Sequence, residues 1–256
     1  MLHYEISGNG KKPLVLLHGF MEDHTIWSDM ESHFSKEFTL IKIDLSGHGK
    51  SENNNAVNSM DFMAEKVKEV IEKLNLNKIN ILGHSMGGYV SLAFAEKFPE
   101  SIESLTLFFS TTLADDEEKK QIRRRSIAVI DENFETFVNT SIPNLFSNNE
   151  KDILEGKIEL AKKIAKSTNK EGVKAAQLGM AERPDRTEIL EKLEAKILII
   201  AGKYDNAVKT ENLLKALPDK TNIKTYVLDC GHCGHWEKPT ICAEIINTEL
   251  LHNLPK

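Results

Sequence analysis

The six residues Gly83-His84-Ser85-Met86-Gly87-Gly88 are the most informative part of this chain. They follow a short apolar run, residues 79–82, and precede a pattern of helical spacing formed by Val90, Ala93, Phe94 and Lys97. A serine with glycine two residues before and after it, between a strand and a helix, is typical of a nucleophile elbow. The turn strains the serine backbone, and side chains at the flanking glycines would collide with the tight loop. The following helix N-terminus favours negative charge beside the serine.

Length and composition restrict the class of protein. A chain of 256 residues suits one sizeable domain, or a domain with an insertion. The net charge of −6 argues against nucleic acid as a partner. The first residues lack the pattern of a signal peptide, and no apolar run has the length of a membrane span. Three cysteines do not form a disulfide framework. We therefore expect a cytoplasmic protein with no membrane span.

Predominantly apolar stretches indicate the sheet, and the one at residues 14–17 is continuously apolar. They lie at residues 14–17, 39–45, 79–82, 105–109, 196–201 and 225–228, with a short edge strand at 2–7. Continuous rather than alternating apolar strands are typical of a parallel sheet that helices cover on both faces. Helices are expected over residues 24–36, after the N-cap Ser59, after the elbow, and from Pro239 toward Leu251. The fold class is therefore α/β, with a mostly parallel, doubly wound sheet.

The alternation of strands and helices stops after the apolar run at residues 105–109. From residue 112 to residue 193 only helical patterns occur, such as Leu154, Ile158 and Ala161. We therefore expect an α/β core formed by residues 1–111 and 194–256, with a helical cap inserted at residues 112–193.

An activated serine needs a base, and the base needs an acid that orients it. Ligands of doubly wound sheets lie at the carboxyl ends of the strands, so these partners should follow strands directly. Asp205 follows the run at 196–201, and His232 follows the run at 225–228. The chain order Ser85, Asp205, His232 is the order that accompanies this elbow. The sequence predicts these three residues as a catalytic triad.

Alternative residues exist for both partners of the serine. His235 lies on the same final loop, but His232 is nearer the strand end and follows a glycine. Asp229 also adjoins this loop and is the rival of Asp205 as the acid. Asp44 follows a strand too, and there we expect it to bind loop amides instead.

An oxyanion hole needs two backbone N–H donors aimed at the developing negative charge. One is expected from Met86, the residue after the nucleophile. The other is expected from Phe20, in the sequence His18-Gly19-Phe20 that follows the run at 14–17.

Together these motifs resemble the α/β-hydrolase superfamily over nearly the whole chain. The resemblance includes the D-x-x-G-H-G-x-S turn at residues 44–51 and Gly231-His232 with Glu237 and Pro239 at the family's usual offsets. Those offsets favour His232 over His235. The resemblance implies Ser85 as nucleophile, Asp205 as acid, His232 as base, and Phe20 and Met86 as oxyanion donors. It also implies a helical cap and no metal or organic cofactor.

The end of the cap, residues 179–186, resembles small carboxylesterases and 3-oxoadipate enol-lactonase-like proteins. A serine nucleophile argues against the dehalogenase and epoxide hydrolase branches, which use aspartate. The resemblance therefore implies a serine hydrolase that cleaves an ester of a small molecule through an acyl-enzyme. Alternatives on the same triad are a lactonase, a C–C bond hydrolase and a vitamin-K-pathway synthase; a non-catalytic ligand sensor of this fold is less favoured.

Two further features have a functional and a structural interpretation. Cys230 and Cys233 form a C-x-x-C pattern around His232, which suits a redox switch, but two small residues lining a loop explain it more simply. Arg123, Arg124 and Arg125 suit an acidic substrate or partner, but a solvated helix face is the more common role of such a run.

Overall fold

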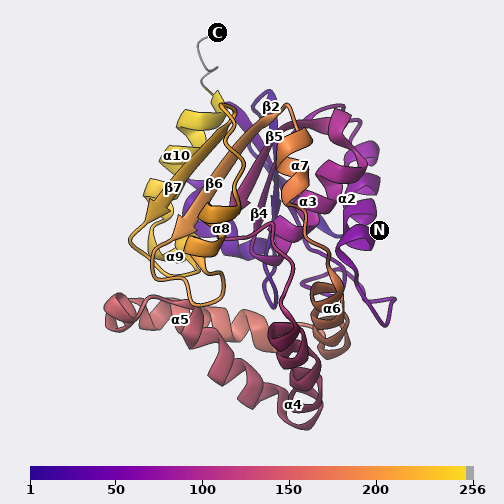
Figure 1. Ribbon diagram of the computed structural model, residues 1–256, viewed down its shortest axis with the longest axis vertical. Helices are drawn as coiled ribbons and strands as arrows, with labels where there is room; N and C mark the ends of the chain where they lie inside the picture. Colours follow the sequence, from indigo (N-terminus) through magenta and orange to yellow (C-terminus); the bar gives the residue numbers. More distant parts are fainter. Residues whose placement is uncertain (252–256) are drawn as a thin grey trace.

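The computed structural model describes residues 1–251. Its centre is a seven-stranded sheet in the order β1-β3-β2-β4-β5-β6-β7 (Figure 1). The strands are Tyr4–Ser7 (β1), Lys12–Leu17 (β2), Phe38–Ile43 (β3), Ile79–His84 (β4), Ile102–Phe108 (β5), Lys196–Gly202 (β6) and Ile223–Leu228 (β7). Only β1 pairs antiparallel, at one edge; the other strand pairs are parallel. The expected fold class is confirmed.

Helices cover both faces of the sheet, which explains why the central strands are apolar on both sides (Figure 1). One core lies between the sheet and Met60–Lys73 (α2), Met86–Lys97 (α3) and Thr187–Lys192 (α7). The second core contains side chains from Ser28–Glu31 (α1) and Pro239–Leu251 (α10). Ser59 caps α2 as expected, because its hydroxyl accepts a hydrogen bond from Phe62 N.

The short helices lie at the ends of strands and in connections. They are His24–Trp27 (η1), Pro99–Ser101 (η2), Ile142–Leu145 (η3), Asn148–Glu150 (η4), Thr210–Ala216 (α8) and Gly234–Glu237 (α9). The long helix expected over residues 24–36 is wrong: a 3₁₀ turn (η1) leads into the four-residue α1. Trp27 and Met30 are three residues apart, a spacing that a 3₁₀ turn also places on one face. Both side chains are fully buried.

Three helices form a separate layer beyond the sheet, at the bottom of Figure 1. They are Glu117–Ser141 (α4), Lys151–Ser167 (α5) and Lys170–Glu182 (α6). Helix α4 is kinked at Asn133, whose side chain accepts a hydrogen bond from Thr136 N and so caps the second half. Helix α7, also inside the expected cap, packs instead against α3 and contributes Ile189 and Leu190 to the core.

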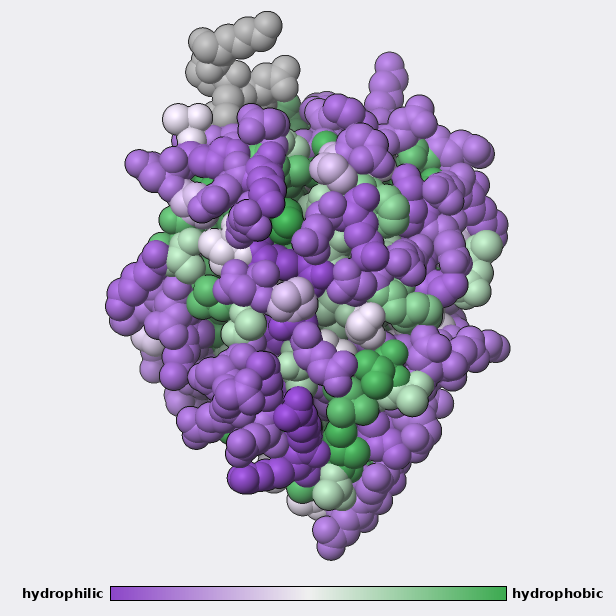
Figure 2. Space-filling model, turned by 45° about the vertical axis from the view of Figure 1, so that its right-hand side comes forward, coloured by the Kyte–Doolittle hydropathy of each residue, from purple (hydrophilic) through white to green (hydrophobic). Residues whose placement is uncertain are grey.

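The surface is mostly polar. Figure 2 shows apolar side chains gathered over the lower part of the molecule, where the layer of α4 to α6 lies. Exposed apolar residues of this layer are Ile122, Val129, Ile153 and Leu160. Within residues 1–251, no helix has the length and hydrophobicity needed to cross a membrane.

Candidate active site

Ser85 lies on a sharp turn between β4 and α3, and its backbone has φ of 51°. The flanking glycines explain how this turn fits. A Cβ on Gly83 would lie 2.2 Å from the carbonyl oxygen of Gly87, and a Cβ on Gly87 would lie 2.3 Å from the carbonyl oxygen of Leu17. Real side chains cannot occupy such positions without moving the backbone. The left-handed conformation of Ser85 costs on the order of 1–3 kcal/mol, which the surrounding sheet and helix must offset.

The structure brings the three predicted catalytic side chains into one hydrogen-bonded chain. The Oγ of Ser85 lies 2.8 Å from Nε2 of His232, and Nδ1 of His232 lies 2.7 Å from Oδ2 of Asp205. The side chains of His232 and Asp205 are both buried, at 3% and 1% exposure. A carboxylate on Nδ1 selects the tautomer whose Nε2 can accept the proton of the serine hydroxyl.

Backbone contacts hold Asp205 and His232 in place. The other carboxylate oxygen of Asp205 accepts hydrogen bonds from the amides of Ala207 and Val208, both at 2.8 Å. The backbone N–H of His232 donates to the carbonyl oxygen of Leu145, at 2.7 Å. Because Leu145 belongs to η3, the segment that carries the candidate base is attached to the inserted helical region.

The rival residues lie elsewhere. Asp229 is exposed and forms an ion pair with Lys203. Asp44 accepts hydrogen bonds from the amides of His24 and Lys50, as expected for a residue that orders a loop. His235 is fully buried with its ring against that of His84, and burial holds its pKa well below the usual range.

The two predicted oxyanion donors flank Ser85. Met86 is the first residue of α3, where the amide has no partner within the helix. Phe20 follows Gly19 and lines the same cavity as Ser85. A Cβ on Gly19 would lie 3.2 Å from Cβ of Ser85, which shows how closely this loop approaches the serine.

A buried ion pair lies beside the serine, and the sequence patterns did not predict it. The carboxylate of Glu22 lies 2.8 Å from Nδ1 of His84 and accepts a hydrogen bond from Gly19 N. Burial opposes both charges, but each group stabilises the other: the pKa of Glu22 falls to about 2, and the pKa of His84 is raised. The opposite nitrogen of His84 lies 3.0 Å from the carbonyl oxygen of His232. Glu22 and His84 therefore connect the loop that carries Phe20 with the loop that carries His232.

The candidate triad opens into a cavity of about 700 Å³ between the core and the layer of α4 to α6. Its wall combines aromatic and apolar side chains with charged ones, including Tyr89, Leu113, Phe137, Met180, Arg123 and Arg183. The expectation of a solvated helix face holds for the exposed Arg124 and Arg125 but is wrong for Arg123. That side chain is largely buried and pairs with Asp115, which also binds Arg183 at 2.8 Å.

The three cysteines are free and buried. Burial raises the pKa of the Cys230 and Cys233 thiols, and that of Cys242 to about 12. Because the thiolate is the reactive form, these thiols are poor candidates for a redox switch. Within the described residues, two groups of imidazoles and carboxylates are close enough to hold a metal: Glu22, His84 and His235, and a second group of His3, Glu5 and His24.

The sheet order, the elbow and the cavity together define a doubly wound α/β fold with a candidate site at the strand ends. Residues 12–239 match the model of the alpha/beta hydrolase fold family, so the chain belongs to this family. A 2-hydroxy-6-oxononadienedioate/2-hydroxy-6-oxononatrienedioate hydrolase of Escherichia coli is 27% identical over 92% of this chain and 86% of its own length.

Solved structures agree with this assignment. A thermophilic esterase from Thermogutta terrifontis, solved with malate bound, is 32% identical and has a TM-score of 0.91, covering 98% of this chain and 93% of its own. The enol-lactonase from Burkholderia xenovorans LB400, at 21% identity, shares the fold with a TM-score of 0.89 over 98% of this chain and 96% of its own. The protein is therefore an enzyme of the hydrolase class.

Proposed function

We propose that this enzyme cleaves carboxylic esters of small molecules through an acyl-enzyme on Ser85. The observation that carries the proposal is the hydrogen-bonded chain from Ser85 through His232 to Asp205, at the floor of the cavity. The 32% identical esterase with the same fold supports the ester as the bond that is cleaved.

In this mechanism Oγ of Ser85 attacks the ester carbonyl carbon while Nε2 of His232 takes the hydroxyl proton. Asp205 holds the imidazole and stabilises its charged form. The backbone N–H groups of Phe20 and Met86 bind the oxyanion of the tetrahedral intermediate. His232 then donates its proton to the departing alcohol. A water molecule, deprotonated by His232, attacks the acyl-enzyme and releases the acid.

Ser85→Ala is the direct test. We expect it to lower turnover of p-nitrophenyl butyrate by about 10⁶-fold, as in other enzymes with this triad. Circular dichroism and thermal unfolding of the same variant should match the wild type, because Ala removes only the hydroxyl. Undiminished hydrolysis would contradict the assignment of the nucleophile.

A second candidate is a hydrolase for substrates that carry a free carboxylate. Arg123 in the cavity wall favours it, and the E. coli relative is named for dioate substrates. Asp115 neutralises part of the arginine charge, so the ester with a neutral acyl chain remains the first candidate.

Two esters of similar length distinguish the candidates: p-nitrophenyl butyrate and the p-nitrophenyl monoester of succinate. For a carboxylate-binding enzyme, kcat/KM for the succinyl ester should fall about tenfold or more in Arg123→Gln, since charge-assisted hydrogen bonds contribute about 1.5–3 kcal/mol. Arg125→Gln, on the exposed face, is the matched control. Equal effects on both esters would exclude the second candidate.

We further propose that residues 112–193 act as the cap over this cavity. Helices α4 and α6 supply Arg123 and Met180 to its wall, whereas the packing of α7 against α3 attaches the end of the segment to the core.

A further inference from the structure

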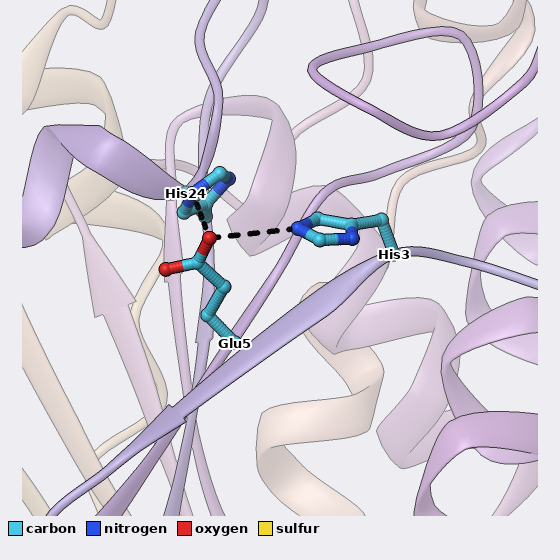
Figure 3. A group of neighbouring side chains, drawn as sticks. All are labelled: His3, Glu5 and His24. Atoms are coloured by element: carbon cyan, nitrogen blue, oxygen red, sulfur yellow. Dashed lines mark ion pairs between the residues drawn. The ribbon is translucent and has the colours of Figure 1, made fainter.

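A group of two histidines and a glutamate lies outside the candidate active site, where β1 meets the loop after β2. Figure 3 shows the side chains of His3, Glu5 and His24 turned toward one another. His3 immediately precedes the strand β1, Glu5 lies within it, and His24 begins η1. The fold thus brings an edge strand and a distant loop together at this point.

The distances among these atoms suit a shared cation. Oε1 of Glu5 lies 3.1 Å from Nε2 of His24 and 3.7 Å from Nε2 of His3. The three ligand atoms all lie within 4.8 Å of one another. A tetrahedral zinc with bonds of 2.0–2.1 Å separates neighbouring ligand atoms by about 3.4 Å. Small side-chain rotations therefore bring all three atoms onto one ion.

A second carboxylate orients His24. Its Nδ1 lies 2.9 Å from Oδ1 of Asp44, whose side chain is fully buried. A hydrogen bond from Nδ1–H to this carboxylate leaves the lone pair of a neutral imidazole on Nε2, the atom that faces Glu5. Metal-binding histidines are commonly held by such a carboxylate, which fixes the tautomer and raises the basicity of the ligand nitrogen.

The ring of His3 contributes a nitrogen atom, Nε2, that has no hydrogen-bond partner. Its Nε2 is buried and makes no hydrogen bond, although the side chain as a whole is 29% exposed. Nε2 lies 4.0 Å from Oδ2 of Asp44 as well. A buried polar atom without a partner is unfavourable, and bonding to a cation would satisfy it.

Lys50 opposes a cation at this position. Its ammonium group lies 3.2 Å from Oε1 of Glu5 and so competes for the same oxygen. The lysine side chain is 63% exposed, so it can move into solvent at little cost.

We propose that His3, Glu5 and His24 form a binding site for a zinc-like divalent cation, with Asp44 as the residue that orients His24. A site with two imidazole nitrogens and one carboxylate binds Zn²⁺ and Co²⁺ in preference to Mg²⁺ or Ca²⁺, which favour oxygen ligands. Three protein ligands leave a fourth position for water. The bound ion would connect β1 to the loop that continues from Phe20 and Glu22. This role is structural and does not depend on the proposed esterase activity.

Binding of Co²⁺ and Zn²⁺ to the untagged protein tests the site. We expect one Co²⁺ per chain with the visible absorption bands of a tetrahedral ion, and we expect Zn²⁺ to displace it. His3→Gln, Glu5→Gln and His24→Gln should each abolish this spectrum, and Asp44→Asn should weaken binding about 10–100-fold. The control is His33→Gln, an exposed histidine whose ring lies beside the hydroxyl of Thr240 and away from this group, which should bind like the wild type.

Lys50→Gln should change the affinity for Co²⁺ in the opposite direction, toward tighter binding, and a damaged fold could not produce such a change. Removal of the competing ammonium should tighten Co²⁺ binding several-fold. The proposal is overturned if the wild type shows no stoichiometric tetrahedral spectrum, if any of the three ligand variants keeps it, or if Lys50→Gln binds no better than the wild type. Hydrolysis of p-nitrophenyl butyrate, measured in parallel, reports separately on the proposed function.

Discussion

Gly83 and Gly156 show how much the surroundings of a residue decide the effect of one added methyl group. The Cβ of an alanine at 83 would lie 2.2 Å from the backbone of the elbow, whereas at 156, inside α5, nothing lies within 4 Å. We expect Gly83→Ala to lower the free energy of unfolding by about 1–3 kcal/mol. Gly156→Ala should raise it by about 0.5–1 kcal/mol, because alanine restricts the unfolded chain. Urea unfolding measures both, and a Gly83→Ala protein as stable as Gly156→Ala would contradict the steric argument.

The candidate site was largely predictable at this scale, because its residue types follow strands in a recognisable order. Ser85, Asp205 and His232 each come within four residues of the end of an apolar run, and parallel strands end at one edge of the sheet. Arg123 was not predictable. The sequence does not distinguish the three consecutive arginines from one another. In the structure the first of them differs from the other two because it forms an ion pair with Asp115.

At the scale of elements, the ion pair of Glu22 and His84 joins the loop after β2 to the end of β4. The pKa of Glu22 lies at about 2, below its ordinary 4.5, so its contribution to stability is present above pH 4.5 and is lost as the pH falls toward 2. The pKa of His84 is raised, so its contribution is complete below pH 6.5 and is lost as the pH rises through the higher value. The pair therefore stabilises the fold most between pH 4.5 and 6.5.

Glu22→Gln should accordingly destabilise the protein by about 3 kcal/mol in that window, the cost of a buried charge without its partner, and by less at higher pH. Urea unfolding of variant and wild type at several pH values checks this. A difference that does not change with pH would mean that His84 is neutral in the folded protein.

Such connections between elements are what sequence patterns miss. Glu22 and His84 are 62 residues apart, and neither belongs to a motif that specifies the other. The turn at η1 was missed for a related reason: apolar residues three apart fit an α-helix and a 3₁₀ turn equally well. The strands were predicted more reliably. A strand that is buried on both faces of the sheet needs apolar side chains at most of its positions, and this pattern can be recognised without knowing which distant residues it contacts.

The whole molecule consists of a sheet core and a helical layer. The chain passes between them at two points, and Asp115 lies where these two connections are close together. Asp115 is at the entry to the helical segment, and Arg183 is at its exit. The carboxylate of Asp115 binds Arg183 and Arg123, while the Arg183 guanidinium lies 4.0 Å from the ring centroid of Tyr89 in α3. The carboxylate thus holds both connecting segments, and with them the cavity wall, against the core.

Asp115→Ala should therefore change both stability and substrate binding. Two guanidinium groups, one buried and one largely buried, would lose their shared partner, at a cost of about 3–5 kcal/mol. The less constrained helical layer should raise KM for p-nitrophenyl butyrate more than it lowers kcat, because the candidate triad belongs to other segments. Asp131→Ala is the matched control: Asp131 is half exposed and pairs with Lys174 on the outside of the same layer, so its loss should cost much less stability than the loss of Asp115. Equal costs for the two variants, measured by urea unfolding, would show that the Asp115 cluster does not hold the helical layer on the core.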